Sequence, residues 1–234
     1  MNNNKKILAI CHEYPFLGFL APIFNDIGIK VHMVALNNEI ADDLPDDPSA
    51  YDGVVIFGSK ESVYDVDNLP WLQNEIDWIK NFLNSGKPVL GICFGCQILT
   101  HIYGGTVHLG SKGTSFGFRR LSVVGDDPIF GKDLDGCLAY TAHNDTFTPA
   151  PQAEHLAKNE FYPNQAFKFA DNVYGVQFHP EATADEAVRW RQGRQQAGTL
   201  PDDAPSVDNI YAQFAKNEVC VLSWLKGFIE RLFL

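Results

Sequence analysis

Four short, continuous apolar runs near the start of the chain constrain its fold more than any other feature. Each run has the length of a strand and is followed by a polar or helix-like segment, which is the spacing of alternating β–α units. Strands that are apolar throughout are typical of a parallel sheet with both faces covered. The four runs are Lys6–Cys11, Val31–Leu36, Tyr51–Gly58 and Pro88–Cys93.

A helix is predicted between the third and fourth runs, from Trp71 to Ser85. Pro70 suits its first turn, and Gly86 is placed to end it. Apolar residues recur there at helical spacing: Leu72, Ile76, Ile79 and Leu83. The first part of the chain is therefore predicted to be an α/β unit with a mostly parallel sheet.

After about residue 105 the sequence alternates short strand-like segments with turn residues, which indicates a smaller, more antiparallel part. These segments are Phe118–Val124, Leu138–Ala142, Gln165–Ala170 and Val173–His179. No internal repeat or low-complexity linker separates the two parts, so we expect one domain over residues 1–234.

A helical extension is predicted from about residue 184 to residue 234. Residues 184–205 are polar and indicate a helix followed by a surface loop, whereas residues 207–234 carry apolar side chains at helical spacing. We expect the second helix to pack onto the domain, with a homodimer contact as the alternative.

The composition argues against several partners and locations. The 234 residues carry a formal net charge of −11, which disfavours nucleic acid and anionic membrane surfaces. No segment has the length of a membrane span or the pattern of a signal peptide. The five cysteines are an odd number in a chain too large to need cross-links, which favours a cytoplasmic location. Cys11, Cys137 and Cys220 lie in apolar stretches and are expected to be buried thiols.

Cys93 stands where a buried strand meets a helix, a position that suits a nucleophile. The strand ends at Cys93 and a helix is expected over residues 97–102, so the thiol would lie at a helix N-terminus, which favours its ionised form. Gly91 and Gly95 remove side chains where strand and helix approach, as in the G-x-S-x-G corner of serine hydrolases. The backbone N–H of Phe94 would face an oxyanion formed over Cys93.

A cysteine nucleophile also needs a base and a group that orients the base. The stretch VYGVQFHPE, Val173–Glu181, supplies a histidine followed by a carboxylate at a strand end. His179 would reach the edge of the sheet, and Glu181 would accept a hydrogen bond from one ring nitrogen. The isolated histidines are interpreted as structural or surface residues: His12, His32, His101, His108 and His155.

The spacing Cys93-x-x-Cys96 has two other interpretations. In thioredoxin-like proteins a C-x-x-C pair opens a helix after a strand, but there it follows the first strand of the fold. A zinc site would need a second pair of cysteine or histidine ligands, which the sequence lacks. We therefore expect no metal and no cofactor, and we interpret Cys96 as a small residue packed on the inner face of the helix.

Taken together, these stretches resemble the class I, or triad, glutamine amidotransferases, and especially their stand-alone, GMP-synthase-like subgroup. The resemblance runs from about Lys6 to about Ala184. The matching stretches are GICFGCQ (91–97), VYGVQFHPE (173–181), GVVIFGSKESVYD (53–65), HNDTF (143–147) and NQAF (164–167).

The resemblance implies a flavodoxin-like three-layer α/β fold and hydrolysis of the side-chain amide of glutamine. Cys93 would attack the amide carbon to give a γ-glutamyl thioester, with His179 passing protons and Glu181 orienting His179. Ammonia would leave first, and water would then release glutamate. The sequence contains no P-loop, so an enzyme that uses the ammonia would be a separate synthetase subunit.

The resemblance also assigns the residues around the substrate. The oxyanion hole maps onto the N–H of Phe94 and a backbone N–H in the Gly58-Ser59 turn. Further substrate contacts map onto Gln97, His143, Asp145 and Phe116.

Three positions depart from the family pattern. The usual Gly-Gly-Pro turn reads Gly58-Ser59-Lys60, and Ser59 would be strained if the turn required a positive φ. Ser115 stands where relatives often have Glu, and Asn144 replaces the glycine of an H-G-D motif. These changes affect substrate recognition and leave the Cys-His-Glu set complete.

Three functions are compatible with this sequence. The first is an amidotransferase or glutaminase that supplies ammonia to a separate synthetase. The second is a γ-glutamyl hydrolase or peptidase that uses the same three residues on γ-glutamyl compounds. The third is a non-enzymatic binding or regulatory descendant, which the complete Cys93–His179–Glu181 set disfavours.

Overall fold

The fold is built on one large sheet and two small ones in a computed structural model that describes residues 5–37 and 43–234. The large sheet contains β1 (Lys6–Cys11), β2 (Lys30–Ala35), β3 (Gly53–Ile56), β4 (Val89–Ile92), β7 (Ser122–Val123), β10 (Glu154–Lys158), β11 (Ala166–Ala170) and β12 (Val173–Val176). The small sheets pair β5 (Thr106–Leu109) with β9 (Asp145–Thr148) and β6 (Ser115–Arg120) with β8 (Leu138–His143). The helices are α1 (Leu20–Asp26), α2 (Pro70–Leu83), α3 (Phe94–Ile102), α4 (Ala184–Gln196) and α5 (Val207–Phe233), with 3-10 turns η1 (Pro48–Ala50) and η2 (Val63–Asn68).

The large sheet has the strand order β2-β1-β3-β4-β12-β11-β10-β7. Its first five strands pair in parallel, and β11, β10 and β7 continue the sheet antiparallel. The antiparallel part predicted after residue 105 is therefore divided between this edge and the two small sheets, while β12 joins the parallel part beside β4.

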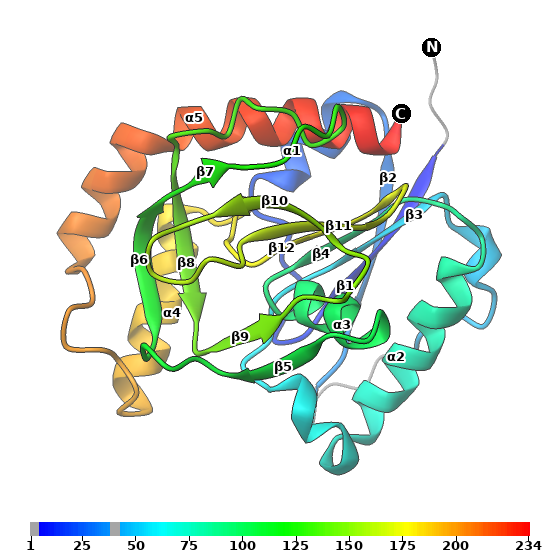
Figure 1. Ribbon diagram of the computed structural model, residues 1–234, viewed down its shortest axis with the longest axis horizontal. Helices are drawn as coiled ribbons and strands as arrows, with labels where there is room; N and C mark the ends of the chain where they lie inside the picture. Colours follow the sequence, from blue (N-terminus) through cyan, green and yellow to red (C-terminus); the bar gives the residue numbers. More distant parts are fainter. Residues whose placement is uncertain (1–4, 38–42) are drawn as a thin grey trace.

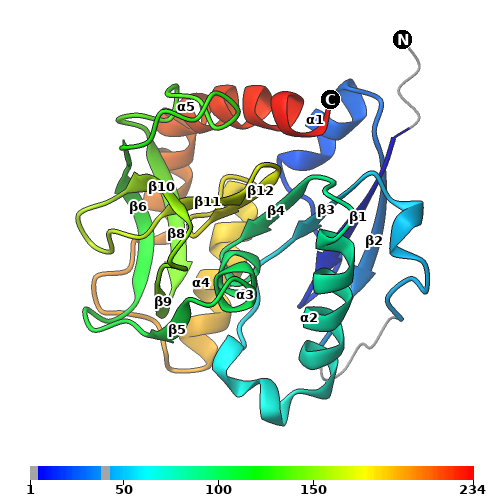
Figure 2. The same cartoon turned by 45° about the vertical axis from the view of Figure 1, so that its right-hand side comes forward.

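Helices cover both faces of the large sheet, which gives three layers (Figures 1 and 2). Along β1, Ile7 and Ala9 face a core shared with α1 and α5, whereas Leu8 and Ile10 face a core shared with α2 and α3. This alternation explains why the strand is apolar throughout, because both of its faces are buried. The predicted flavodoxin-like three-layer fold is confirmed.

Most predicted elements appear within a few residues of their expected bounds. The helix expected over Trp71–Ser85 is α2, Pro70–Leu83. The segment Phe118–Val124 is instead divided between β6 and β7 around the buried Leu121. Strands β5, β9 and β10 are not predicted from the sequence, because none of them contains a continuous apolar run.

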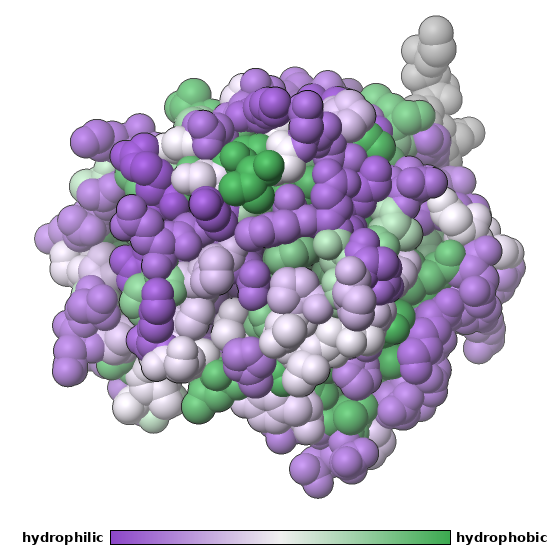
Figure 3. All heavy atoms as spheres, viewed as in Figure 1, coloured by the Kyte–Doolittle hydropathy of each residue, from purple (hydrophilic) through white to green (hydrophobic). Residues whose placement is uncertain are grey.

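The C-terminal extension forms α4 and α5 as predicted, and α5 lies along the face of the sheet that also carries α1 (Figure 1). Its apolar stripe, including Trp224, Leu225 and Phe228, is buried against that face. The apolar stripe of α5 therefore packs against other residues of the same chain. On the face drawn in Figure 3, hydrophobic residues occur in small separate groups among hydrophilic ones.

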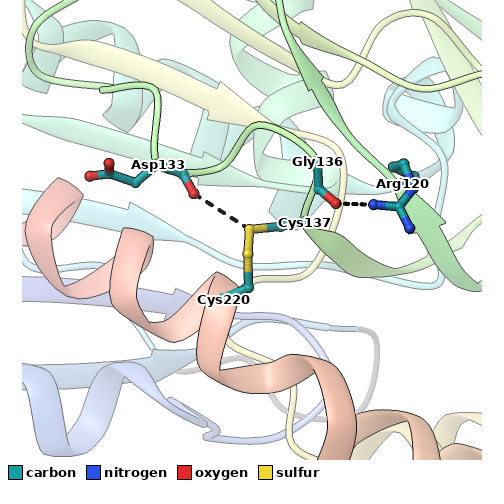
Figure 4. The surroundings of a disulfide bond; sticks show 5 residues. All are labelled: Arg120, Asp133, Gly136, Cys137 and Cys220. Carbon is teal, nitrogen blue, oxygen red and sulfur yellow. Dashed lines mark hydrogen bonds between the residues drawn. A yellow bond between two sulfur atoms is a disulfide. The ribbon is translucent and has the colours of Figure 1, made fainter.

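Cys137 and Cys220 form a disulfide, so the prediction that both are buried thiols is wrong (Figure 4). Their Cα atoms lie 5.8 Å apart, within the usual range for a disulfide, although 83 residues separate them in the sequence. Cys220 is also exposed on α5, whereas Cys137 is buried just before β8. Only the packing of α5 beside β8 brings the two together, and the odd cysteine count carries no information about it.

None of the helices in the described ranges is long and apolar enough to cross a membrane.

Candidate active site

Four neighbouring parallel strands end at the same edge of the sheet, and the residues that follow them form the site. The register pairs Ile10 with Ile56, and Ile92 with Val176, so the chain leaves β1, β3, β4 and β12 at one level. Ligands bind in open α/β sheets at this carboxyl edge. The residues delivered there are His12 after β1, Gly58 and Ser59 after β3, Cys93 after β4, and Gln177 and His179 after β12.

Cys93 caps the N-terminus of α3 in a strained backbone conformation, with φ 53° and ψ −102°. It has the only positive φ of any residue other than glycine in the described ranges. A Cβ on Gly91 would lie 2.5 Å from the backbone of Gly95, and a Cβ on Gly95 would lie 2.3 Å from the carbonyl oxygen of Ile56. The two glycines are therefore required by close backbone contact, as the G-x-C-x-G pattern predicted.

His179 and Glu181 form a buried pair beside Cys93. His179 Nδ1 lies 2.8 Å from Glu181 Oε1, and the two residues are 6% and 1% exposed. The backbone N–H of His179 donates to Tyr140 O of β8 at 2.8 Å, and the ring packs against Trp190 of α4 at 4.6 Å between centroids. These contacts leave His179 little freedom to rotate.

The electrostatics of the pair favour a protonated His179. Burial by itself lowers the pKa of His179, but the charges of Glu181 and Cys93 more than offset burial and raise the pKa to about 10. The other ring nitrogen, Nε2, is buried and has no hydrogen-bond partner in the described part of the chain. An imidazolium whose Nδ1–H is held by Glu181 can therefore offer its Nε2–H to the sulfur of Cys93.

Gln177, which the sequence analysis did not single out, contacts the sulfur directly. Its Nε2 donates to Cys93 Sγ at 3.4 Å, and its Oε1 accepts a bond from Gln97 Nε2 at 3.1 Å. It follows the last residue of β12 and stands two residues before His179. The signal was present in the VQFHPE motif, where only His179 and Glu181 were assigned roles.

The Gly58-Ser59 turn lies against the same group of residues. A Cβ on Gly58 would be 3.1 Å from His179 Cε1 and 3.7 Å from Cys93 Cβ. Ser59 does not have a positive φ, so the strain considered for a serine at this turn does not arise. Its Oγ accepts a hydrogen bond from the N–H of Glu61 at 3.1 Å, which helps to shape the turn. The N–H groups of Ser59 and Phe94 donate to no acceptor within residues 5–37 and 43–234.

His143 and Asp145 line the cavity but differ in whether their side-chain polar atoms have hydrogen-bond partners. Burial lowers the pKa of His143 to about 4, so the ring is neutral at pH 7, and Nδ1 donates to Asp145 O at 2.8 Å. Its Nε2 is then a buried acceptor with no partner in the described chain. The carboxylate of Asp145, by contrast, already accepts hydrogen bonds from Ser62 Oγ at 2.6 Å and Tyr64 OH at 3.2 Å.

Two other predicted substrate contacts have different surroundings. Gln97 lines the cavity beside Cys93. Phe116 is not part of the cavity wall; it packs against Tyr140 at 5.6 Å between ring centroids, and the Arg194 guanidinium covers it at 5.6 Å. Asn144, at the departure from H-G-D, accepts a hydrogen bond from Arg194 Nη1 at 3.1 Å.

The cavity has a volume of about 510 Å³ and is closed on one side by α4. Arg189, Trp190 and Arg194 of α4 line it together with Cys93 and His179. From the sequence, α4 is predicted only as a polar helix, because nothing in its period shows that one face turns toward a cavity. Only its packing beside β8 and α5 reveals this role.

Cys96 takes no part in this arrangement. It is fully buried, burial raises its pKa well above the ordinary value, and a Cβ on Gly175 would lie 2.7 Å from its sulfur. This agrees with the packing role predicted for it. No group of three or more potential metal ligands occurs among the described residues.

Fold and site together define a class of protein: an α/β protein with a cysteine at a strand–helix corner and a His–Glu pair at the neighbouring strand end. The sequence matches the family "Glutamine amidotransferase class-I" over residues 16–189, and the chain belongs to this family.

Known proteins of this class resemble the chain over different lengths. A glutamine-hydrolysing GMP synthase of Porphyromonas gingivalis is 35% identical over 141 residues, covering 59% of this chain and 26% of that protein. γ-Glutamyl peptidase 5 of Arabidopsis thaliana is 33% identical over 147 residues, covering 59% of this chain and 58% of that protein. The match thus spans less than two thirds of either relative. A solved glutamine amidotransferase from Thermotoga maritima superposes with a TM-score of 0.87 at 25% identity, covering 99% of both chains.

Proposed function

We propose that this chain hydrolyses the side-chain amide of glutamine, with Cys93, His179 and Glu181 as its catalytic triad. The observation that carries the proposal is the pairing of His179 with Glu181, 2.8 Å apart and buried, beside a cysteine held at the N-terminus of α3. Family membership supports the same reaction, as does the name of the GMP synthase relative, which describes it as glutamine-hydrolysing.

In the proposed reaction, Cys93 is the nucleophile and His179 supplies the proton. The Cys93 thiolate attacks the amide carbon, and the carbonyl oxygen takes up the electron pair as an oxyanion. His179 then donates its Nε2 proton to the leaving nitrogen, and ammonia departs as the C–N bond breaks. In the second half, neutral His179 accepts a proton from water, whose oxygen attacks the thioester, and glutamate leaves as the sulfur regains its electrons.

The proposed oxyanion hole consists of the backbone N–H groups of Phe94 and Ser59. Both are free of protein acceptors in the described ranges, and the residues flank Cys93. We further propose that Gln97 contacts the substrate and that the neutral Nε2 of His143 accepts a hydrogen bond from the α-ammonium group. The carboxylate of Asp145, which accepts hydrogen bonds from Ser62 and Tyr64, then holds the cavity wall, and Phe116 supports the wall by packing against Arg194.

The decisive experiment compares two alanine variants of neighbouring cysteines. Purified protein is incubated with glutamine, and both glutamate and ammonia are measured. Cys93→Ala should abolish release, whereas Cys96→Ala should retain most of it in the folded protein. Comparable losses in both variants, with both still folded by circular dichroism, would show that Cys93 is not the nucleophile.

A separate synthetase is the proposed partner that uses the ammonia. The region that the matched GMP synthase shares with this chain covers 26% of that protein. Adding a candidate synthetase with its nucleotide substrates should raise the rate of glutamine hydrolysis. An unchanged rate, with free ammonia accumulating, would point to a glutaminase that works alone.

The volume of the cavity and the arginine residues that line it favour a second function. Its volume of about 510 Å³ lies in the middle of the range typical of small-molecule sites, and α4 supplies two guanidinium groups to it. A γ-glutamyl peptide would carry its carboxylate toward these cations, and the same thioester would form with an amino acid as leaving group. This reaction is the alternative that the similarity to a γ-glutamyl peptidase supports.

The two functions are separated by their substrates. Glutamine and γ-glutamyl dipeptides are compared as kcat/KM, with Arg194→Gln beside the wild type. A peptidase should prefer the dipeptide and lose this preference in the variant. An amidotransferase should prefer glutamine in both proteins.

A cytoplasmic location is also a proposal. The chemistry requires Cys93 as a free thiol, and Cys11 and Cys96 are free as well, which suits a reducing compartment. Thiol titration of the denatured protein from freshly lysed cells tests this. Five reactive thiols would mean that Cys137 and Cys220 are reduced in the cell, and three would mean that they are joined there.

A further inference from the structure

A buried histidine–carboxylate pair contacts the proposed oxyanion turn. His12 follows β1, and its Nε2 lies 3.0 Å and 3.1 Å from the two carboxylate oxygens of Glu75 on α2. Both side chains are fully buried. A carboxylate is almost never buried without a partner, because its desolvation costs several kcal/mol, roughly. The proposed reaction uses neither residue.

The second ring nitrogen of His12 reaches the turn itself. Nδ1 lies 3.2 Å from the carbonyl oxygen of Gly58. A carbonyl oxygen can only accept a hydrogen bond, so Nδ1 must carry a proton and donate it. The Glu75 carboxylate is also an acceptor, so a second proton is held between Nε2 and the carboxylate, and Glu75 thereby fixes which ring nitrogen faces Gly58.

The Gly58 carbonyl and the Ser59 N–H belong to the same peptide unit. All peptide bonds in the described ranges are trans, so the two groups point in opposite directions. When His12 holds the carbonyl, the N–H is directed away from His12. Ser59, like His12, lines the cavity that contains Cys93. A hydrogen bond to the carbonyl also polarises the peptide and strengthens its N–H as a donor.

The ring of His12 is itself held in place. It packs edge-on against Phe94, with 5.0 Å between ring centroids, and against Trp71 at 5.7 Å. Phe94 carries the other proposed oxyanion donor. His12 thus contacts the residues on which both halves of the proposed oxyanion hole depend, while the sulfur of Cys93 accepts a hydrogen bond from Gln177.

From this geometry we propose that His12, oriented by Glu75, is a positioning residue that aims the Ser59 N–H at the oxyanion. The proposal rests on the function proposed above, and it assigns a catalytic consequence to a histidine interpreted from the sequence as merely structural. Loss of the Nδ1–H donor would weaken one oxyanion contact, whose complete removal costs roughly 10²–10³ in kcat. We therefore expect a smaller loss, of roughly tenfold to a hundredfold.

The test uses two matched double variants, so that no buried carboxylate is left unpaired. In both, Glu75→Gln removes the charge. In one, His12→Asn keeps an N–H donor near the position of Nδ1, and in the other, His12→Leu removes the donor. We expect His12→Leu/Glu75→Gln to lower kcat for glutamine by tenfold or more with little change in KM, and His12→Asn/Glu75→Gln to recover most of the loss.

Two further measurements separate this role from general damage. Glutamate γ-semialdehyde adds to a cysteine as a hemithioacetal whose oxygen occupies the oxyanion hole, so its affinity should fall in parallel with kcat. Alkylation of Cys93 by iodoacetamide reports on the thiol and His179, and its rate should stay within about twofold of the wild type.

The outcomes distinguish failure of this inference from failure of the proposed function. A wild-type protein that hydrolyses neither glutamine nor γ-glutamyl compounds would overturn the proposed function. An active wild type whose His12→Leu/Glu75→Gln variant keeps its kcat, or loses alkylation together with kcat, would overturn the positioning role alone. Circular dichroism establishes beforehand that both variants are folded.

Discussion

Gln177 donates a hydrogen bond from its side-chain amide to the sulfur of Cys93 at 3.4 Å. Gln97 anchors the other end of this amide, so the donor is held in place from the opposite side. A neutral donor stabilises a thiolate without competing for the proton of His179, because an amide does not titrate in this range. The sulfur thus has a hydrogen-bond donor that does not titrate.

We predict that Gln177→Met, which keeps the length of the side chain and removes the donor, lowers kcat for glutamate release. The expected loss is roughly tenfold to a hundredfold, the range for one hydrogen bond to a charged group. Gln165→Met is the matched control, because Gln165 is equally buried but its side-chain amide donates to the carbonyl oxygen of Tyr162. Equal losses in the two variants would assign the effect to packing.

The backbone at Cys93 predicts an unusual order of stabilities. With φ 53° and ψ −102°, a residue with a Cβ is strained, and strain of this kind costs roughly 1–3 kcal/mol. In urea titrations, the free energy of unfolding of Cys93→Gly should therefore exceed that of Cys93→Ala by about 1 kcal/mol, even though glycine usually destabilises. The same pair of substitutions at Cys96, inside α3, should show the opposite order.

The pH dependence of stability follows from His179. Its pKa of about 10, against 6.5 for an ordinary histidine, means that the native state holds a proton that the unfolded chain has released. This contribution to stability is fully present below about pH 6.5 and is lost as the pH rises toward about 10. The excess stability of the wild type over His179→Gln should shrink across this window in urea titrations. His101→Gln, at an exposed position on α3, should show no such trend.

His143 predicts the reverse behaviour in acid. Burial lowers its pKa to about 4, so between about pH 6.5 and pH 4 the unfolded chain binds a proton that the native state does not bind. Its contribution is intact above about pH 6.5 and is lost as the pH falls toward about 4, by up to about 3 kcal/mol. His143→Gln should reduce this loss of stability in acid. A variant as acid-sensitive as the wild type would show that other groups control acid unfolding.

The disulfide predicts a response to reduction that is independent of the site. Cys137 and Cys220 close a long loop between β8 and α5, and such a cross-link stabilises by roughly 2–4 kcal/mol, chiefly by restricting the unfolded chain. Dithiothreitol should lower the melting temperature of the wild type by several degrees, roughly, and leave Cys137→Ala/Cys220→Ala unaffected. The reduced protein should remain active if the bond only stabilises α5 against the domain.

Local patterns carried much of the fold and part of the candidate site. The apolar runs became parallel strands because a strand buried on both faces needs apolar residues at every position, as Ile7 and Leu8 illustrate. Cys93 with its flanking glycines, and His179 with Glu181, were recognisable because strand-to-helix corners and strand ends bring short sequence motifs into fixed geometry. The roles proposed for these residues remain predictions until the variants are measured.

Tertiary structure alone decided the contacts between distant segments. His12 and Glu75, Gln97 and Gln177, and Cys137 and Cys220 are all partners that no local period pairs. Each pair depends on which strands lie side by side and which helix covers them, and sequence spacing does not encode either. The residue pattern predicts an α/β fold with a cysteine corner and a His–Glu strand end, because these are local features. The contacts that support the site residues depend on the packing of the whole chain.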